Sequence, residues 1–325
     1  MQPRRRWFLI VSVVLSLSIS AFVWAQEYPT KPVTLIIPFG PGGGHDLLFR
    51  AVTSVAVDYL GQPIIIKLMP GGGGAIGADA GAKASPDGYT LFAGGNTPST
   101  ALPALEGRGK GPDQMEAICQ VNYNPTIMIS RPDAPFKTWK QMMEWVKANP
   151  GKLVVGTPGP WSPPDVIWKH LMKETGISVK TVPFDGGGPV ILALLGGHID
   201  VGSALPIIYS PYKSTGKMQA LLTLEEKRLP DLPNVPTSAE EGVQGAATLN
   251  MLGRSWRGVM APKGTPRAII DKVASAFKKM TEDKTVMAMI KQTGDEIHYL
   301  GPNEFAQAWR NEFEVYKELG KSFKK

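Results

Sequence analysis

Short apolar runs alternate with amphipathic segments along most of the chain, and glycine or proline marks nearly every boundary between them. The short runs predict strands, and segments with apolar residues three or four positions apart predict helices. The predicted strands are 33–37, 64–68, 89–93, 127–130, 153–156, 179–183, 199–203 and 255–259. The predicted helices are 47–59, 76–83, 139–148, 164–175, 189–195, 266–281 and 302–319. This alternation predicts parallel sheets covered by helices.

The alternation begins again after a loose stretch rich in glycine and proline at 107–112, which indicates a second domain. We expect residues 26–124 to form the first part of domain 1 and residues 125–245 to form domain 2. Residues 246–325 are expected to return to domain 1 with the C-terminal helices. The expected fold is therefore a two-lobed α/β protein, each lobe a mainly parallel sheet flanked by helices, with a cleft between the lobes.

The N-terminus has the pattern of a secretory signal peptide. Three arginines at 4–6 precede the largely apolar run 7–24, and Val23 and Ala25 stand at the positions that a signal peptidase reads. We expect residues 1–25 to be removed after Ala25, so that the mature protein is exported. The alternative is a permanent membrane anchor, because the run is about as long as a short spanning helix. The pattern leaves open whether the general secretory or the twin-arginine route is used.

Charge and residue content exclude several classes of function. The chain carries a net charge of +7, and removing three arginines with the signal leaves +4. Its basic residues are scattered, which argues against nucleic acid as a partner. Cys119, the only cysteine, stands among apolar residues and is expected to be buried rather than reactive. No cysteine and histidine spacing is typical of a metal site, so we expect neither a metal nor a cofactor.

Glycine-rich loops stand at 40–46, 70–74, 156–161 and 185–188, each at the end of a predicted strand. The exposed N–H groups of such a loop and the dipole of the following helix attract an anion without a cationic side chain. Ligands of open α/β sheets bind beyond the carboxyl ends of the strands. The loops therefore predict a site for a carboxylate or a phosphate. The alternative is that the glycines only permit tight turns, and for 71–74 the two interpretations are balanced.

No nucleotide-binding or nucleophile signature accompanies these loops. Asp46 is expected to cap the helix that follows it. His45 is a candidate ligand contact, because it stands where a small turn residue is usual. Phe39, Trp161 and Trp256 lie beside strand ends and are candidates for an aromatic wall or for ordinary core. Arg254 is either a surface arginine or a partner for a second carboxylate.

A set of short motifs stands in order along the mature chain, at 28–32, 36–39, 42–46, 70–78, 84–91, 182–184, 194–197, 232–237, 255–258 and 261–266. Together these motifs resemble the receptors of tripartite tricarboxylate transporters, also called the Bug family. The resemblance implies a periplasmic Venus-flytrap receptor, similar to type II periplasmic binding proteins. It further implies a monomer that delivers a small organic carboxylate to the membrane permease subunits of the transporter.

The resemblance also implies which residues bind the ligand, chiefly main-chain groups of 42–46 and 185–189. The candidate ligand-binding residues are Phe39, Gly42, Gly43, Gly44, His45, Asp46, Asn96, Trp161, Ser162, Asp185, Gly186, Gly187, Gly188, Ser203 and Trp256. The chain departs from the family at His45, where threonine or a similar residue is common, and at Trp161, Pro163 and Pro164. These departures leave open a monocarboxylate, a dicarboxylate or an aromatic acid.

Two other functions stay open from the sequence. An exported enzyme would use the glycine loops as an oxyanion or phosphate site. An orphan sensor would bind the ligand without serving a permease. Because no nucleophile, base or metal set accompanies the loops, we expect a receptor and no enzymatic activity.

Overall fold

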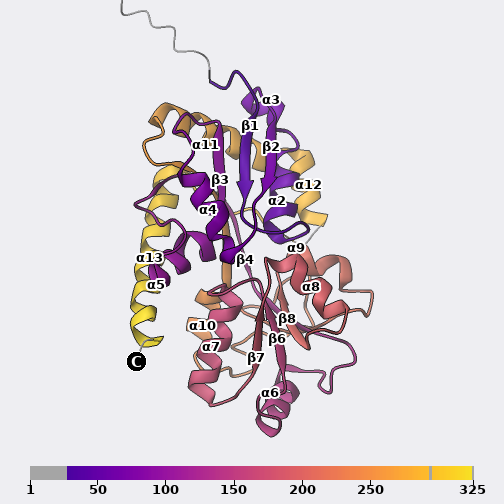
Figure 1. Ribbon diagram of the computed structural model, residues 1–325. Coiled ribbons are helices and arrows are strands. Elements are labelled where there is room, and N and C mark those ends of the chain that lie inside the picture. The colour runs from indigo at the N-terminus through magenta and orange to yellow at the C-terminus, as the bar shows by residue number, and fades with distance from the viewer. Residues whose placement is uncertain (1–27, 293–294, 324–325) are drawn as a thin grey trace, which may run out of the picture.

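Two five-stranded sheets form two lobes, joined where the chain passes between them (Figure 1). The computed structural model describes residues 28–292 and 295–323, so the expected signal peptide lies outside the described residues. The first sheet consists of β1 Val33–Ile37, β2 Ile64–Leu68, β3 Thr90–Gly95, β4 Met115–Pro125 and β10 Arg254–Pro262. The second consists of β5 Ile127–Ser130, β6 Val154–Thr157, β7 Lys180–Pro183, β8 Val201–Ala204 and β9 Gln219–Thr223.

Helices cover both sheets. The first lobe carries α2 Gly44–Thr53, α3 Ala56–Leu60, α4 Ala75–Ala82, α5 Leu102–Glu106, α11 Arg267–Glu282, α12 Lys284–Gln292 and α13 Pro302–Phe323. The second lobe carries α6 Trp139–Ala148, α7 Pro163–Thr175, α8 Gly187–Leu195, α9 Pro206–Tyr209 and α10 Ala246–Gly253. Short helical turns lie at Gly72–Gly74, Thr97–Ala101 and Ser210–Tyr212. No described helix is both long and apolar enough to cross a membrane.

The strand order of each sheet confirms the predicted fold class. The orders are β2–β1–β3–β10–β4 and β7–β6–β8–β5–β9. In the first sheet β10 runs antiparallel to both of its neighbours, and in the second β5 does the same. The remaining strands of each sheet share one direction, so both sheets are mainly parallel, and helices lie on their faces as in other α/β folds.

The chain passes from the first sheet to the second at Thr126, between β4 and β5, and returns between α10 and β10. These two segments are bonded to each other, because the Thr126 N–H and hydroxyl both donate to the Gly253 carbonyl, at 3.0 and 2.8 Å. Helix α10 packs against α7 of the second lobe. We therefore propose that the return to the first lobe begins after Gly253 rather than at residue 246.

Several predicted elements have the observed bounds, including strands 33–37, 64–68 and 127–130 and helix 139–148. The predicted helix 47–59 is instead two helices, α2 and α3. The pattern also missed β4, the longest described strand. Its buried side chains include Gln120, Asn122 and Asn124, and these polar residues interrupt the apolar pattern that would have revealed it.

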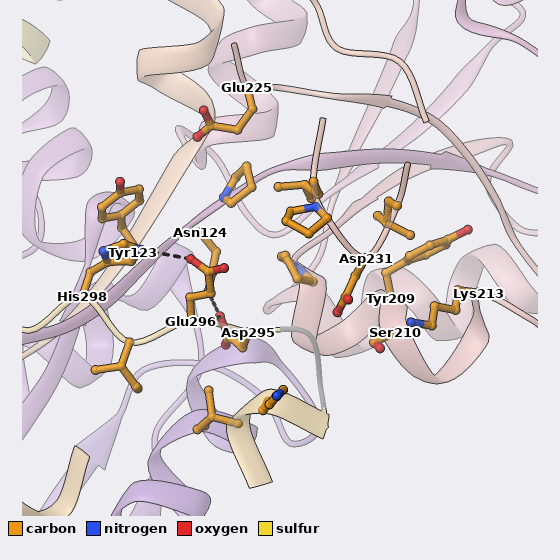
Figure 2. Close-up of a pocket in the computed structure, with 18 of the residues that line it drawn as sticks. Tyr123, Asn124, Tyr209, Ser210, Lys213, Glu225, Asp231, Asp295, Glu296 and His298 are labelled. Atoms are coloured by element: carbon orange, nitrogen blue, oxygen red, sulfur yellow. Dashed lines mark hydrogen bonds and ion pairs between the residues drawn. The ribbon is translucent and has the colours of Figure 1, made fainter. Parts of the chain in front are cut away.

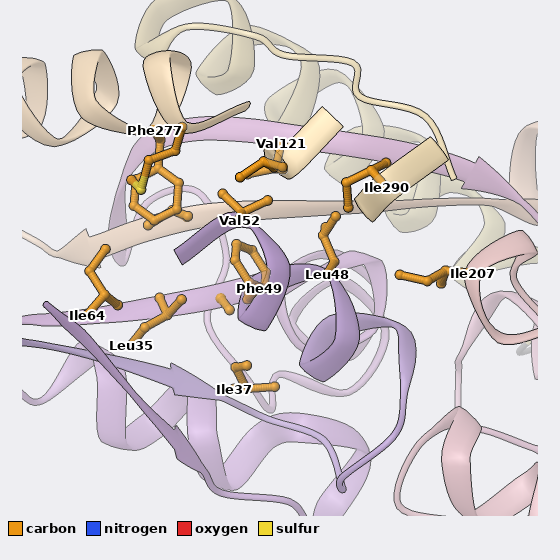
Figure 3. Packing of buried hydrophobic residues seen from close by; sticks show 14 of the residues in the cluster. Leu35, Ile37, Leu48, Phe49, Val52, Ile64, Val121, Ile207, Phe277 and Ile290 are labelled. Atoms are coloured by element: carbon orange, nitrogen blue, oxygen red, sulfur yellow. The ribbon is translucent and has the colours of Figure 1, made fainter. Parts of the chain in front are cut away.

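The core of the first lobe forms between α2 and the sheet. Leu48, Phe49 and Val52 share one face of α2 and are fully buried, together with Leu35 of β1 and Phe277 of α11 (Figure 3). Burying each of these side chains stabilises the fold by about 1.5–3 kcal/mol. This packing fixes the position of the N-terminal end of α2, which carries the glycine loop.

The single cysteine is part of the same core. Cys119 lies in β4 and is fully buried, as the apolar sequence around it predicts. Burial raises the pKa of its thiol far above the ordinary value. The thiol is therefore protonated and unreactive in the folded protein.

Candidate functional site

A cavity of about 80 Å³ lies between the two lobes. Its walls come from the loop before α2, the segment after β3, the start of β10 and, on the other lobe, the loops before α7, α8 and α9. Ten of the fifteen candidate residues line this cavity: Phe39, Gly43, Gly44, His45, Asn96, Ser162, Gly186, Gly187, Ser203 and Trp256. The other five, Gly42, Asp46, Trp161, Asp185 and Gly188, lie outside the lining.

Two helices from opposite lobes begin at the cavity without a side-chain cap. The N-caps of α2 and α8 are Gly43 and Gly186, and neither makes a side-chain capping bond. The N–H groups of a first helical turn have no partner within their helix, and the helix dipole adds positive potential there. The two N-termini together form a site suited to an anion.

A third helix contributes an apolar wall instead. The first two positions of α7 are Pro163 and Pro164, which have no N–H groups, and the Asp165 N–H is bonded to the Ser162 hydroxyl at 3.4 Å. Both prolines line the cavity. The donors for an anion therefore come from α2 and α8, while α7 provides carbon atoms.

Asp46 stabilises the loop at the start of α2. One carboxylate oxygen accepts the Gly42 N–H at 3.0 Å, and the other accepts Nε of Arg50 at 2.7 Å. The side chain is buried. This arrangement holds Gly42, whose φ of +71° suits glycine, in the shape that presents Gly43 and Gly44 to the cavity.

Burial beside an arginine favours the electrically neutral form of the His45 ring. Its Nε2 atom is 3.2 Å from the Gly94 carbonyl, and its ring lies 4.7 Å from that of Phe39. Burial and the charge of Arg257 lower the pKa of His45 to about 3. Arg257 itself is fully buried beneath the loop, where it donates to the Gly44 carbonyl at 3.0 Å and pairs with Asp295 at 3.2 Å.

Glu312 of α13 fixes two of the lining side chains, and nothing in the sequence distinguished it from the exposed acids of the same helix. Its carboxylate accepts bonds from Nδ2 of Asn96 and Nε1 of Trp256, both at 2.5 Å, and from Thr100 at 2.9 Å. Burial raises the pKa of this carboxyl group. The Asn96 amide is also bonded to the Arg254 carbonyl and the Trp256 N–H, so it orients the wall of the cavity.

The glycine loops of the two lobes touch through their main chains. The Gly40 N–H donates to the Asp185 carbonyl at 3.0 Å. A Cβ atom on Gly188 would lie only 2.6 Å from the Pro41 carbonyl oxygen. Gly73 and Gly159 approach each other in a similar way. A Cβ atom added to Gly159 would lie 3.2 Å from the Cα atom of Gly73. The loop at 71–74 therefore takes part in contact between the lobes and does not line the cavity.

Trp161 bridges the lobes outside the cavity. Its indole N–H donates to Glu106 of the first lobe, and the Lys169 ammonium lies 4.5 Å from the ring centre. Its φ of +59° is unusual for a residue other than glycine, and its main-chain N–H is held by Asp165 at 2.8 Å. These contacts fit a residue that holds the two lobes together.

A larger cavity, about 940 Å³, adjoins the crossing strand β4 (Figure 2). No glycine loop reaches it, and several of its charged side chains are already paired. Glu225 accepts Arg254 at 3.1 Å, and Glu296 lies 3.5 Å from His298. Arg254 is therefore bound to an acid of the second lobe and does not line the smaller cavity. The smaller cavity, with its two helix N-termini, is the better candidate for an anion.

Comparison with known proteins identifies the family. Residues 48–322 match the model of the tripartite tricarboxylate transporter family receptor. The chain belongs to this receptor family. It is 30% identical over 289 residues to the UPF0065 protein in the gbd 5′ region of Cupriavidus necator, covering 87% of this chain and 84% of the relative.

Solved structures agree with this assignment. The periplasmic binding protein BugD is 29% identical, with a TM-score of 0.84 over 91% of this receptor and 98% of BugD. MatC from Rhodopseudomonas palustris with bound malate is 27% identical, with a TM-score of 0.81 over 90% of this receptor and all of MatC (100%). The family consists of binding receptors, so the protein is not an enzyme, and the alternative of an exported enzyme is excluded.

The substitution Gly188→Ala should weaken ligand binding by at least about tenfold. The added methyl group would meet the Pro41 carbonyl and keep the lobes apart, so the arrangement in which the two glycine loops touch would be less populated. Calorimetric titration with a carboxylate that binds the unmodified receptor measures this. Gly301→Ala is the control, because its Cβ atom would meet only a glutamate oxygen at 3.9 Å. Equal affinity in Gly188→Ala and the unmodified receptor would show that this contact is not needed for binding.

The substitution Trp161→Phe should weaken the binding of all ligands by the same factor, about three- to tenfold, because it removes one hydrogen bond between the lobes. The affinities of the variant and the unmodified receptor for two carboxylates of different shape are measured. The ratio of the two affinities should be the same in both proteins. Trp145→Phe, in α6 away from the cavity, is the matched control. A change in the ratio would place Trp161 in contact with the ligand instead.

Proposed function

We propose that the receptor captures a small organic carboxylate in the cavity between its lobes and delivers it to the permease subunits of a tripartite tricarboxylate transporter. The main support is the pair of uncapped helix N-termini, of α2 and α8, at one cavity. They offer main-chain N–H groups and positive potential from both lobes, which suits a group with two anionic oxygens.

The expected energetics are consistent with tight binding. A micromolar dissociation constant corresponds to about 8 kcal/mol. Charge-assisted hydrogen bonds contribute roughly 1.5–3 kcal/mol each, and part of this offsets lost motion. Phe39, Pro163 and Trp256 add apolar surface for the body of the ligand. Several N–H donors and this surface together would reach the micromolar range.

The malate bound to MatC supports a carboxylate as the ligand. For this receptor the choice among monocarboxylate, dicarboxylate and aromatic acid is part of the proposal. The double passage of the chain at Thr126 and Gly253 supports closure of the lobes as a hinge motion. A ligand that contacts both lobes would favour the closed form.

We also propose that residues 1–25 direct export and are cleaved after Ala25, which places a monomeric receptor in the periplasm. The motive is the order of basic, apolar and small residues in that segment. Intact-mass measurement of the periplasmic fraction should give the mass of a chain that begins at Gln26. Full-length protein recovered only with membranes would contradict cleavage.

Binding should require the negative charge of the carboxylate. A panel of small carboxylates should include acids that bind in the micromolar range, whereas the primary amides of those acids should bind at least about a hundredfold more weakly. Isothermal titration calorimetry measures both series, with neutral sugars and cationic amino acids as controls. Equal affinity for acid and amide, or binding of the sugars alone, would overturn the proposed ligand class.

A further inference from the structure

We propose that His45 makes the receptor prefer carboxylates that carry a hydroxyl group on the neighbouring carbon, with Nδ1 of His45 accepting the hydroxyl proton. This inference rests on the proposed function, because it names the class of carboxylate that the same cavity takes. It depends on three observations: where the His45 ring lies, which ring nitrogen carries the proton, and which other groups surround the cavity.

The position of the ring is defined by two neighbours. His45 is the second residue of α2 and lines the cavity directly after Gly43 and Gly44. Phe39, which also lines the cavity, packs against it with ring centres 4.7 Å apart. A ligand carboxylate bound at the start of α2 would therefore have the imidazole beside it.

The proton is placed by the bond to the main chain. Nε2 lies 3.2 Å from the Gly94 carbonyl oxygen, which can only accept, so Nε2 carries the hydrogen. In a neutral imidazole the other nitrogen is then an acceptor. Among the described residues, none forms a hydrogen bond with Nδ1. The ring therefore offers a lone pair, which suits a hydroxyl donor and does not suit a second carboxylate.

The surrounding charges keep the ring neutral. Arg257 from β10 lies beneath the loop, and its positive charge opposes protonation of His45. The nearby carboxylate of Asp295 is paired with Arg257. On α2 itself, Asp46 is bonded to Arg50 and the Gly42 N–H. Burial acts in the same direction as Arg257, and the pKa of His45 lies at about 3.

Several polar side chains line the cavity with His45, among them the hydroxyls of Thr97, Ser203 and Ser255, but two others are already bonded elsewhere. No lysine or arginine is found among the described residues that line the cavity. The Asn96 amide is occupied by Glu312, Arg254 and Trp256, and the Thr126 hydroxyl donates to the Gly253 carbonyl. A 2-hydroxy acid would satisfy both the N–H groups of the helix ends and the lone pair of His45.

The first experiment compares ligands on the unmodified receptor. Calorimetric titrations use 2-hydroxypropanoate, propanoate and 2-methoxypropanoate, and the corresponding phenyl series of mandelate, phenylacetate and α-methoxyphenylacetate. In at least one series the hydroxy acid should bind about tenfold more tightly than both partners, because only it can donate to Nδ1. Hydroxy and unsubstituted acids that bind within twofold of each other in both series would overturn the role of His45 and leave the proposed function intact. Failure of every carboxylate to bind would overturn both.

The second experiment assigns the preference to His45. His45→Phe keeps an aromatic ring and removes the acceptor. This variant should therefore bind the hydroxy acid and the unsubstituted acid with about equal affinity. His198→Phe, at an exposed histidine of the second lobe, should keep it. A His45→Phe receptor that folds and retains the tenfold preference would contradict the assignment. If this variant does not fold, the ligand comparison on the unmodified receptor still tests the preference for the hydroxy acid.

The third measurement distinguishes an acceptor from a cation. Since the pKa of His45 is about 3, the affinity for one acid should change by less than about twofold between pH 8 and pH 6. A histidine that bound the carboxylate as a cation would give tighter binding as the pH falls towards about 6.5. Tighter binding at pH 6 that disappears in His45→Phe would overturn the proposal.

Discussion

The contact of two main chains across the cleft is the constraint on which the site depends. The Gly40 N–H reaches the Asp185 carbonyl, and Gly188 lies so close to Pro41 that a single methyl group would not fit. Only this approach brings the N-terminal ends of α2 and α8 to the same small cavity. Because helix dipoles act over about one turn, a wider separation would turn one anion site into two weak ones. The glycines therefore allow the two lobes to approach closely, in addition to permitting the tight turns.

A second layer of buried polar groups keeps the cavity walls in place. Arg257 and Asp295 support the loop of α2 from below, and Glu312 holds Asn96 and Trp256 from the side. Buried charges of this kind are costly unless they are paired and hydrogen-bonded. Apolar residues at these positions would stabilise the fold more. The buried polar groups around the cavity therefore fit a role in fixing the geometry of the site. The result is a wall that is polar behind and largely neutral towards the ligand.

The sequence was sufficient to predict the fold class and the positions of most loops that line the candidate site. It was insufficient to predict contacts between residues that lie far apart in the chain. Local signals are strong where apolar runs end in glycine or proline, so strand 33–37 was predicted with its observed bounds. The loop that follows it is shorter than the predicted 40–46, because α2 begins at Gly44. The conformation within that loop was not predictable, since Gly42 has a positive φ and Gly43 an ordinary one of −79°. Glu312 gave no signal, because Asn96 and Thr100 lie more than two hundred residues away in the chain and Trp256 lies 56 residues away. The position of Trp161 likewise depends on a partner in the other lobe.

The burial of Cys119 has a practical consequence. The receptor has one thiol, and the fold encloses it completely. Fluorescent maleimides react with exposed thiolates, so they would leave this cysteine untouched in the folded protein. A pair of cysteines introduced on the outer surfaces of the two lobes could then carry donor and acceptor dyes without first removing the native residue. The fold thus provides a ready framework for an optical sensor that reports the distance between lobes as ligand is added.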